Sequence, residues 1–292
     1  MTETFDHLDP RVQAAATADQ ARRLAIISSD WWLPYPPGED VIKRLFNLID
    51  LPQRMRPPSL LVHGTPNAGK SAIIKQFCAR FDARAAAQCS DPGAVVCIQA
   101  PPTVDEKRLY IEILGAVGAP APETTVPRLR AMVVRQLRAR NARLLTVDEI
   151  QHALDQRPMA QQIVLNTFKY LSNELSLSIA GFGSSEAKAL VRADEHLAQR
   201  FDIVALPAWD QKQRWVVDFI KQRISLFPLR RATVVDRAFM KALLQASGPV
   251  AGRMLSTLER CAIAAIQNGD ERLSPELIET VTLNVERLEY GL

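Results

Sequence analysis

SLLVHGTPNAGKS, residues 59–71, joins a short apolar run to a glycine-rich loop that ends in lysine and serine. The apolar run predicts a buried strand, and the sequence from Lys70 onward predicts a helix. Gly64 to Ser71 follow the pattern G-x-x-x-x-G-K-S/T, in which backbone amides and the start of the helix converge on phosphate oxygens. A chance glycine turn is the alternative, but a strand before the loop and a helix after it favour phosphate binding.

The same loop predicts a site for ATP with Mg²⁺. Lys70 is expected to reach the β- and γ-phosphates, and the Ser71 hydroxyl is expected to bind the Mg²⁺ ion. The expected nucleotide-binding residues of the loop are Gly64, Thr65, Pro66, Asn67, Ala68, Gly69, Lys70, Ser71 and Ala72.

A second part of this site is expected at the end of RLLTVDE, residues 143–149. This run predicts a strand that carries Asp148 and Glu149 at its carboxyl end. Asp148 is expected to bind the Mg²⁺ shell, and Glu149 is expected to polarise the attacking water as a general base. The alternative is a strand that ends in two solvated acids, and the upstream phosphate loop favours the chemical interpretation.

The wider pattern predicts an α/β fold followed by helices. Apolar runs without alternation, separated by helical segments, are typical of a parallel sheet covered on both faces. The expected strands are residues 59–64, 94–100, 143–149, 177–183 and 201–207, and four helices are expected after Pro207. We therefore predict an N-terminal arm and linker over residues 1–37, an α/β core over 38–209 and a small helical lid domain over 210–292. Prolines 34, 36 and 37 are expected to delay the first core helix until after Gly38.

Three further positions have the residue types that an ATP-hydrolysing site needs. Ser184 follows the fourth strand and is the expected water-orienting residue, with Ser185 as the second choice and a helix N-cap as the alternative. Arg200, or else Arg192, is expected to reach the nucleotide of a neighbouring subunit. The alternative is that this arginine only forms a surface salt bridge. Arg253, in the helical region, is expected to sense the γ-phosphate unless it is an exposed helical arginine. The expected catalytic residues are Glu149, Lys70, Arg200 and Ser184.

Composition permits nucleic-acid binding without requiring it. The 292-residue chain is 47% hydrophobic and 23% charged, with a net charge of +4 and a pI near 9.0. It has no apolar run near the roughly 20 residues that span a bilayer. Its polar, acidic start resembles neither a secretory signal nor a mitochondrial transit peptide, so a cytoplasmic protein is expected. The cysteines form no closely spaced pair, which favours reduced thiols over a metal site or disulfide; they are Cys78, Cys89, Cys97 and Cys261.

Together these motifs, in this order, resemble AAA+ ATPases over residues 30–270. Within that superfamily the chain resembles the TniB and TnsC group of transposition regulators. The resemblance is carried by W-x-x-Y-P at residues 32–36, by LPQRMRPPSLLVHG leading into GTPNAGKS, by VDEIQH, and by FGSSEA with AQRFD. The loop ends in Lys-Ser rather than Lys-Thr, and FGSSEA replaces the more usual G-T/V-x-E-A, which leaves the identity of the polar sensor open.

The resemblance implies a protein that binds ATP, forms a homo-oligomeric ring or helical filament around double-stranded DNA, and presents the target site to a transposase. Its ATP hydrolysis is expected to be weak and dependent on assembly. The implied contacts to the DNA backbone, with little sequence preference, are Lys107, Arg108, Thr124, Thr125 and Arg128; a solvated helix face is the alternative. The implied adenine contacts are Trp32, Leu33 and Tyr35, which would otherwise wedge the N-terminal arm onto the core.

Two other functions use the same parts. One is a helicase loader or initiator in DNA replication, and the other is a signalling ATPase whose helical domain binds protein and never DNA. The signalling class usually has further domains after the helical one, so we expect one of the two DNA-related functions.

Overall fold

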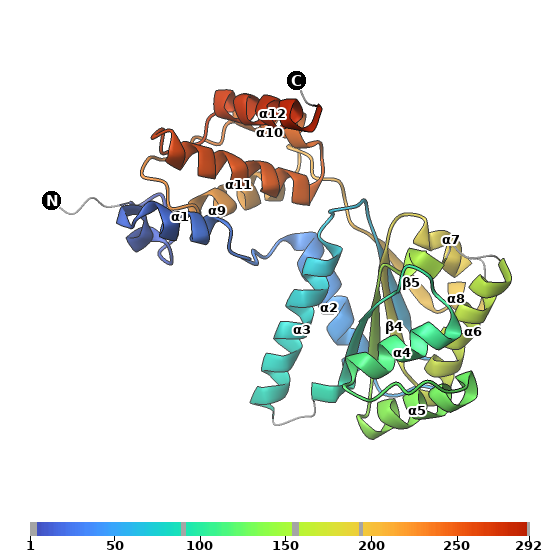
Figure 1. Cartoon of the computed structure of the whole chain (residues 1–292). Helices are drawn as coiled ribbons and strands as arrows, with labels where there is room; N and C mark the ends of the chain where they lie inside the picture. The colour runs from blue at the N-terminus through green and yellow to red at the C-terminus, as the bar shows by residue number, and fades with distance from the viewer. Residues whose placement is uncertain (1–4, 89–91, 154–157, 193–194, 291–292) are drawn as a thin grey trace. The chain divides into compact units, whose positions relative to one another are not determined.

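The computed structural model describes residues 5–88, 92–153, 158–192 and 195–290. It divides into two compact units (Figure 1). The core unit is Pro37–Pro207, and the helical unit combines Met1–Pro36 with Ala208–Leu292. The N-terminal segment, which the sequence suggested as a separate arm, is thus grouped with the C-terminal helices.

The core unit is built on a five-stranded parallel sheet with the strand order β2-β3-β4-β1-β5. The predicted α/β fold with a helical C-terminal part is confirmed. The strands are β1 (Ser59–His63), β2 (Val95–Gln99), β3 (Leu144–Asp148), β4 (Ser178–Gly183) and β5 (Phe201–Ala205).

Burial along the strands follows their place in the sheet. β1 and β4 are buried at every residue and β3 at all but its last, whereas the edge strands β2 and β5 are partly exposed. Strands covered on both faces need continuous apolar runs, which explains why these segments lack alternation. Helices α2 (Pro36–Asp50) and α3 (Lys70–Ala87) lie on one side of the sheet, and α4 (Glu106–Ala116), α5 (Val126–Ala139) and α6 (Pro158–Leu175) lie on the other (Figure 1).

The start of α2 corrects one expectation. Helix α2 begins at Pro36, before Gly38, and includes both Pro36 and Pro37. The first turn of a helix has no intrahelical partner for its N–H groups, so proline is tolerated there and its fixed φ favours the helix. The prolines therefore begin this helix instead of delaying it.

Short elements complete the core unit. Two short helices, α7 (Ala187–Arg192) and α8 (Glu195–Ala198), connect β4 to β5. Single turns of 3-10 helix occur at η2 (Pro92–Ala94), before β2, and at η3 (Ile150–Ala153), directly after the Asp148–Glu149 pair.

The helical unit contains a 3-10 turn and five α-helices in the part of the chain that is described. The elements are η1 (Gln13–Thr17), α1 (Gln20–Ile27), α9 (Arg214–Ser225), α10 (Arg237–Ser247), α11 (Ala251–Gln267) and α12 (Pro275–Tyr290). Within the described residues, no helix combines the length and apolar character that a membrane span needs.

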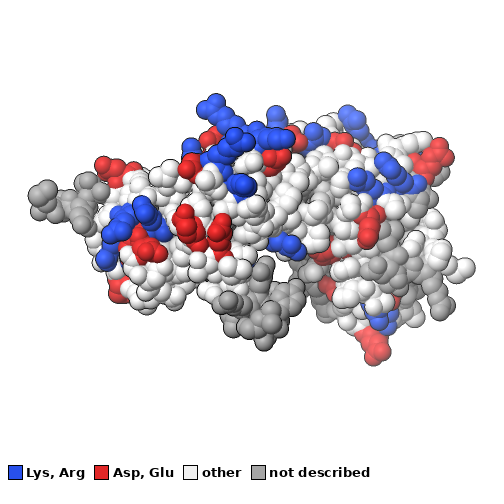
Figure 2. Space-filling model, turned by 90° about the horizontal axis from the view of Figure 1, so that it is seen from above, with Lys and Arg blue, Asp and Glu red and all other residues white. Residues whose placement is uncertain are grey.

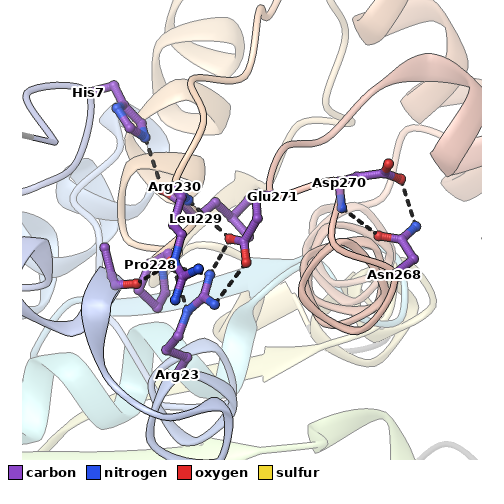
Figure 3. A network of polar contacts seen from close by, with 9 residues as sticks. His7, Arg23, Pro228, Leu229, Arg230, Asn268, Asp270 and Glu271 are labelled. Carbon is purple, nitrogen blue, oxygen red and sulfur yellow. Dashed lines mark hydrogen bonds and ion pairs between the residues drawn. The ribbon is translucent and has the colours of Figure 1, made fainter. Parts of the chain in front are cut away.

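A buried ionic network connects α1 to the loops that follow α9 and α11 (Figure 3). The Arg23 side chain is 4% exposed and pairs with Glu271, with one Nη1–Oε1 distance of 2.9 Å. Its guanidinium also donates to the Pro228 carbonyl, and the backbone N–H of Arg230 donates to Glu271. Burial raises the pKa of Glu271, but the hydrogen bonds from Arg23 and Arg230 outweigh it and leave this pKa below its ordinary value.

We expect Arg23→Met to lower the free energy of unfolding of the helical unit by about 3 kcal/mol, since it leaves a buried carboxylate without its cation. Urea unfolding followed by tryptophan fluorescence measures this, because all four tryptophans (Trp31, Trp32, Trp209 and Trp215) belong to the helical unit. The control is Arg214→Met, whose ion pair with Asp218 is exposed and should contribute less than about 1 kcal/mol. Equal losses in both variants would contradict a structural role for the buried pair.

Candidate functional site

The loop between β1 and α3 has the backbone of a tight phosphate-binding turn. Asn67 and Gly69 have φ values of 61° and 90°, in the left-handed region that glycine enters without strain. A Cβ on Gly64 would lie 3.2 Å from the Cβ atoms of both Ala68 and Leu206. A side chain at position 64 would therefore crowd Ala68 and Leu206, and Gly69 is the N-cap of α3. Backbone N–H groups at a helix start of this kind suit an anion.

Lys70 is a buried cation at the centre of this loop. Its side chain is 7% exposed, and Nζ donates to the carbonyl oxygens of Gly64 at 3.3 Å and Thr65 at 3.1 Å. Among the described residues no carboxylate pairs with it, although a buried charge is costly without a counter-charge. The donor set therefore fits a triphosphate. Nearby, burial and then the charges of Lys188 and Lys70 lower the pKa of His63, at the end of β1.

The phosphate loop and the Asp148–Glu149 pair meet at the carboxyl-terminal ends of the strands. The Ser71 hydroxyl donates to Oδ2 of Asp148 at 2.6 Å, and the other Asp148 oxygen accepts the backbone N–H of Glu149 at 2.9 Å. A hydroxyl and a carboxylate oxygen are ligands of the kind that Mg²⁺ prefers. Among the described residues no group of three or more His, Cys, Asp or Glu could hold a metal ion.

Glu149 is held in place by a residue that sequence reasoning missed. Its φ is 54°, unusual for glutamate, and Gln151 Nε2 donates to its carboxylate. The Oε1 atom of the same amide accepts the backbone N–H of Ser184 at 3.1 Å. Gln151 thus links the end of β3 to the end of β4. A Cβ on Gly183 would lie 2.5 Å from this Oε1, so the link requires glycine there. VDEIQH contains Gln151, but nothing in that motif indicates which way its amide points.

Around β4, the predicted sensor serine makes a local turn. Ser184 is half-buried, and its Oγ accepts the backbone N–H of Glu186 at 3.3 Å, just before α7 begins. Ser185 is exposed. These contacts match the capping alternative without deciding between the two serines as a water-orienting residue.

Arg200 lies at the amino-terminal ends of the strands, whereas the phosphate loop lies at their carboxyl-terminal ends. Its carbonyl accepts the N–H of Ser59, at the start of β1, and its side chain donates to Oδ1 of Asn173, on α6, at 2.8 Å. One strand of five residues, about 16 Å long, separates it from the loop of the same chain. Any contact of Arg200 with a nucleotide therefore has to be with that of another subunit. Arg192, the second choice, is exposed at the end of α7.

The predicted DNA contacts gather at one end of a parallel helix pair. Arg130 of α5 bonds Glu106 at the start of α4, at 2.6 Å, and Arg140 bonds the Val117 carbonyl at the end of α4, at 2.5 Å. The two helices therefore start at the same end. Lysine, arginine and hydroxyl side chains lie there together: Lys107 and Arg108 on α4, Thr124 and Thr125 before α5, and Arg128 in its first turn.

Two of these residues differ in their local contacts. Arg108 donates to the Thr103 carbonyl at 3.1 Å and lies 3.6 Å from the Asp105 carboxylate. Thr125 is the N-cap of α5, yet its side chain makes no capping hydrogen bond. Both are exposed. Figure 2 shows one face of the molecule, on which lysine and arginine side chains gather in clusters with acidic side chains among them.

The predicted adenine contacts belong to an aromatic cluster of the helical unit. Tyr35 is 8% exposed, and its ring lies 5.7 Å from that of Trp209 and 5.9 Å from those of Trp32 and Trp215. Leu33 is buried as well. This packing holds the N-terminal segment against α9 of the helical unit, whereas the alternative interpretation placed it on the core, and an adenine contact stays a prediction. Trp32 Nε1 is buried and has no acceptor among the described residues. Arg253 is exposed on the first turn of α11.

The sequence matches one protein family, and the structure is similar to several solved structures. A family model described as "Bacterial TniB protein" matches residues 23–211. No curated protein matches the sequence.

Several solved structures are similar over most of the chain. The ORC1 protein of Aeropyrum pernix, solved in complex with DNA, is 20% identical, with a TM-score of 0.64 over 90% of this chain and 69% of that one. Cdc6p of Pyrobaculum aerophilum is 18% identical, with a TM-score of 0.68 over 92% and 74%. The Thermotoga maritima RuvB Holliday junction branch migration motor is 14% identical, with a TM-score of 0.52 over 85% and 68%. At these identities the likeness is one of fold.

Proposed function

Because the chain belongs to the TniB family, we propose that it regulates DNA transposition by assembling on duplex DNA while it holds ATP. The chain is an AAA+ ATPase with the fold described above. The observation that carries the proposal is the 2.6 Å hydrogen bond between Ser71 and Asp148, because it joins the phosphate loop to the acidic pair in one site.

Each residue of this site has a distinct role in the proposal. Lys70 binds the β- and γ-phosphates, and Ser71 and Asp148 hold the Mg²⁺ ion, which neutralises phosphate charge when bound. Glu149 accepts the proton of the attacking water. Gln151, which bonds both the Glu149 carboxylate and the Ser184 N–H, positions that base relative to the end of β4. Ser184 or Ser185 orients the water.

Assembly completes the site in this proposal. Arg200 lies at the amino-terminal ends of the strands, beyond reach of the phosphate loop of its own chain. It stabilises transition-state charge on the nucleotide of a neighbouring subunit. Hydrolysis is therefore slow in single subunits and faster in a ring or filament. Arg253 senses the γ-phosphate, and Trp32, Leu33 and Tyr35 adjoin the adenine.

Arg200→Ala should bind ATP normally but hydrolyse it about 10³-fold more slowly in the assembled state. Mixing this variant with Lys70→Ala subunits should restore part of the turnover, because one of the two kinds of mixed interface pairs the intact loop of an Arg200→Ala subunit with the intact arginine of a Lys70→Ala subunit. Steady-state phosphate release in the presence of DNA measures both effects. Absence of rescue would count against an interface role for Arg200, and rescue seen instead with Arg192→Ala would assign the role to Arg192.

The DNA contacts in the proposal are made by the shared end of α4 and α5. Basic and hydroxyl side chains beside two helix starts suit phosphate oxygens. Phosphate contacts position a protein on DNA without reading the DNA sequence. We therefore expect binding to duplex DNA of any sequence, made by Lys107, Arg108, Thr124, Thr125 and Arg128.

Binding to a random duplex should require ATP or a non-hydrolysable analogue, should fail with ADP, and should weaken steeply with salt. Three basic side chains per subunit predict a slope of log K against log salt of about −2.7 for each bound subunit. Removing Lys107, Arg108 and Arg128 together should flatten the slope. Arg135→Ala, further along α5 and also exposed, should leave it unchanged. Salt-independent binding, or none, in a filter assay would remove DNA from the proposal.

A replication initiator or helicase loader is the second candidate function. It is favoured by the similarity of the fold to ORC1 and Cdc6p. The two candidates differ in the partner that the DNA-bound oligomer recruits. Affinity purification with an ATP analogue and DNA should recover a transposase of the integrase type. Recovery of a replicative helicase would support the initiator, and a protein partner without any DNA binding would support a signalling ATPase.

A further inference from the structure

Two cysteines far apart in the sequence face each other in the core unit. Cys78, on α3, and Cys97, on β2, have their Sγ atoms 2.8 Å apart, and both are free thiols. Along β2 the buried residues Val96 and Ile98 pack into the hydrophobic core. Side chains alternate across a strand, so Cys97 points to the opposite face, which α3 covers.

The contact connects two elements of the nucleotide site. Cys78 lies eight residues beyond Lys70 on the same helix, so the cysteine is about 12 Å from the start of α3. Cys97 lies opposite Thr146 in the pairing of β2 with β3, the strand that ends in Asp148. A bond between the two sulfurs would tie the phosphate-loop helix to the edge of the sheet.

The two thiols are chemically different. The contact with Cys78 lowers the pKa of Cys97 below its ordinary value, whereas the same contact and burial raise the pKa of Cys78. Both side chains are only half-buried, so a small oxidant reaches them. A thiolate is the reactive form towards oxidants.

We propose that Cys78 and Cys97 form a reversible disulfide when the protein meets hydrogen peroxide. The Cys97 thiolate attacks one peroxide oxygen, the O–O bond breaks, and water leaves once protonated, so that Cys97 becomes a sulfenic acid. The Cys78 sulfur then attacks the Cys97 sulfur, the S–O bond breaks, and a second water leaves with the Cys78 proton. Two thiols and one peroxide thus give one disulfide and two waters, and a thiol reductant reverses the oxidation. This inference does not depend on the function proposed above.

To test this inference, the folded full chain is treated with peroxide and then unfolded in denaturant, because Cys261 is buried in the folded chain. Thiol titration and non-reducing peptide mapping follow. Of the four cysteines, two should become unreactive after peroxide treatment, a peptide joining residues 78 and 97 should appear, and dithiothreitol should restore both thiols. A Cys89→Ser/Cys261→Ser variant should behave in the same way. Four titratable thiols after oxidation, or a cross-link between other cysteines, would overturn the proposal.

Single variants test the order of the two steps. With Cys78→Ser no disulfide can form, so the sulfenic acid on Cys97 should accumulate and be labelled by dimedone. With Cys97→Ser, dimedone labelling of Cys78 should be at least several-fold weaker. Equal labelling of both variants, or stronger labelling of Cys78, would contradict the assignment of Cys97 as the attacking thiol.

Discussion

Glu149→Gln protein should bind ATP as tightly as the unchanged chain but hydrolyse it about 10²- to 10⁴-fold more slowly, the usual contribution of a general base. The amide that replaces the carboxylate can still accept the hydrogen bond from Gln151, so the substitution removes the base and keeps its position. Because hydrolysis resets the assembly in our proposal, this variant should stay on DNA as an ATP-bound oligomer. Phosphate release and the lifetime of the DNA complex measure the two effects.

The matched control for this variant is Glu112→Gln, the same chemical change at an exposed position of α4. It should alter neither hydrolysis nor the lifetime of the complex. If Glu149→Gln hydrolysed ATP at the normal rate, the base would have to be another residue. Slow hydrolysis combined with weak ATP binding would instead indicate that the substitution had disturbed the loop.

Lys70→Ala should weaken ATP binding by about 100-fold or more, because it removes charge-assisted hydrogen bonds to two phosphates. The free protein should not lose stability in the same proportion. Among the described residues, Lys70 Nζ donates hydrogen bonds only to the carbonyls of Gly64 and Thr65, and its burial without a counter-ion is unfavourable. Titration with a fluorescent ATP analogue and thermal unfolding without nucleotide measure these two quantities.

Lys75→Ala is the control on the same helix, since Lys75 is exposed and lies beyond the loop. It should bind ATP like the unchanged chain. Normal ATP affinity in Lys70→Ala would show that the loop does not bind the triphosphate. A large loss of stability in that variant would show that the lysine has a structural role instead.

Much of the core unit could be predicted from local sequence. The runs before Gly64 and before Asp148 are mostly apolar and lack alternation because β1 and β3 lie inside the sheet, covered on both faces. The phosphate loop is recognisable because glycines that allow a tight backbone turn and a lysine that supplies positive charge occur at fixed spacing. The carboxyl ends of parallel strands share an edge, so the meeting of Ser71 with Asp148 followed from the fold class.

The rest depends on contacts between distant residues. Nothing near Arg23 in the sequence indicates that it pairs with Glu271, 248 positions away, and so the N-terminal segment was not expected within the helical unit. The thiols of Cys78 and Cys97 meet only because β2 turns one face towards α3. Gln151 connects two strand ends through a side-chain orientation that no local pattern specifies.

Calorimetric titration of ATP into the full chain, with and without Mg²⁺, tests the central claim most directly. A single site formed by the Gly64–Ser71 loop and the Asp148–Glu149 pair predicts one ATP per chain and tighter binding when Mg²⁺ is present. It also predicts that Asp148→Asn abolishes the effect of Mg²⁺. The absence of any heat of ATP binding, or an ATP affinity that is the same with and without Mg²⁺ in the unchanged protein, would contradict this single ATP site.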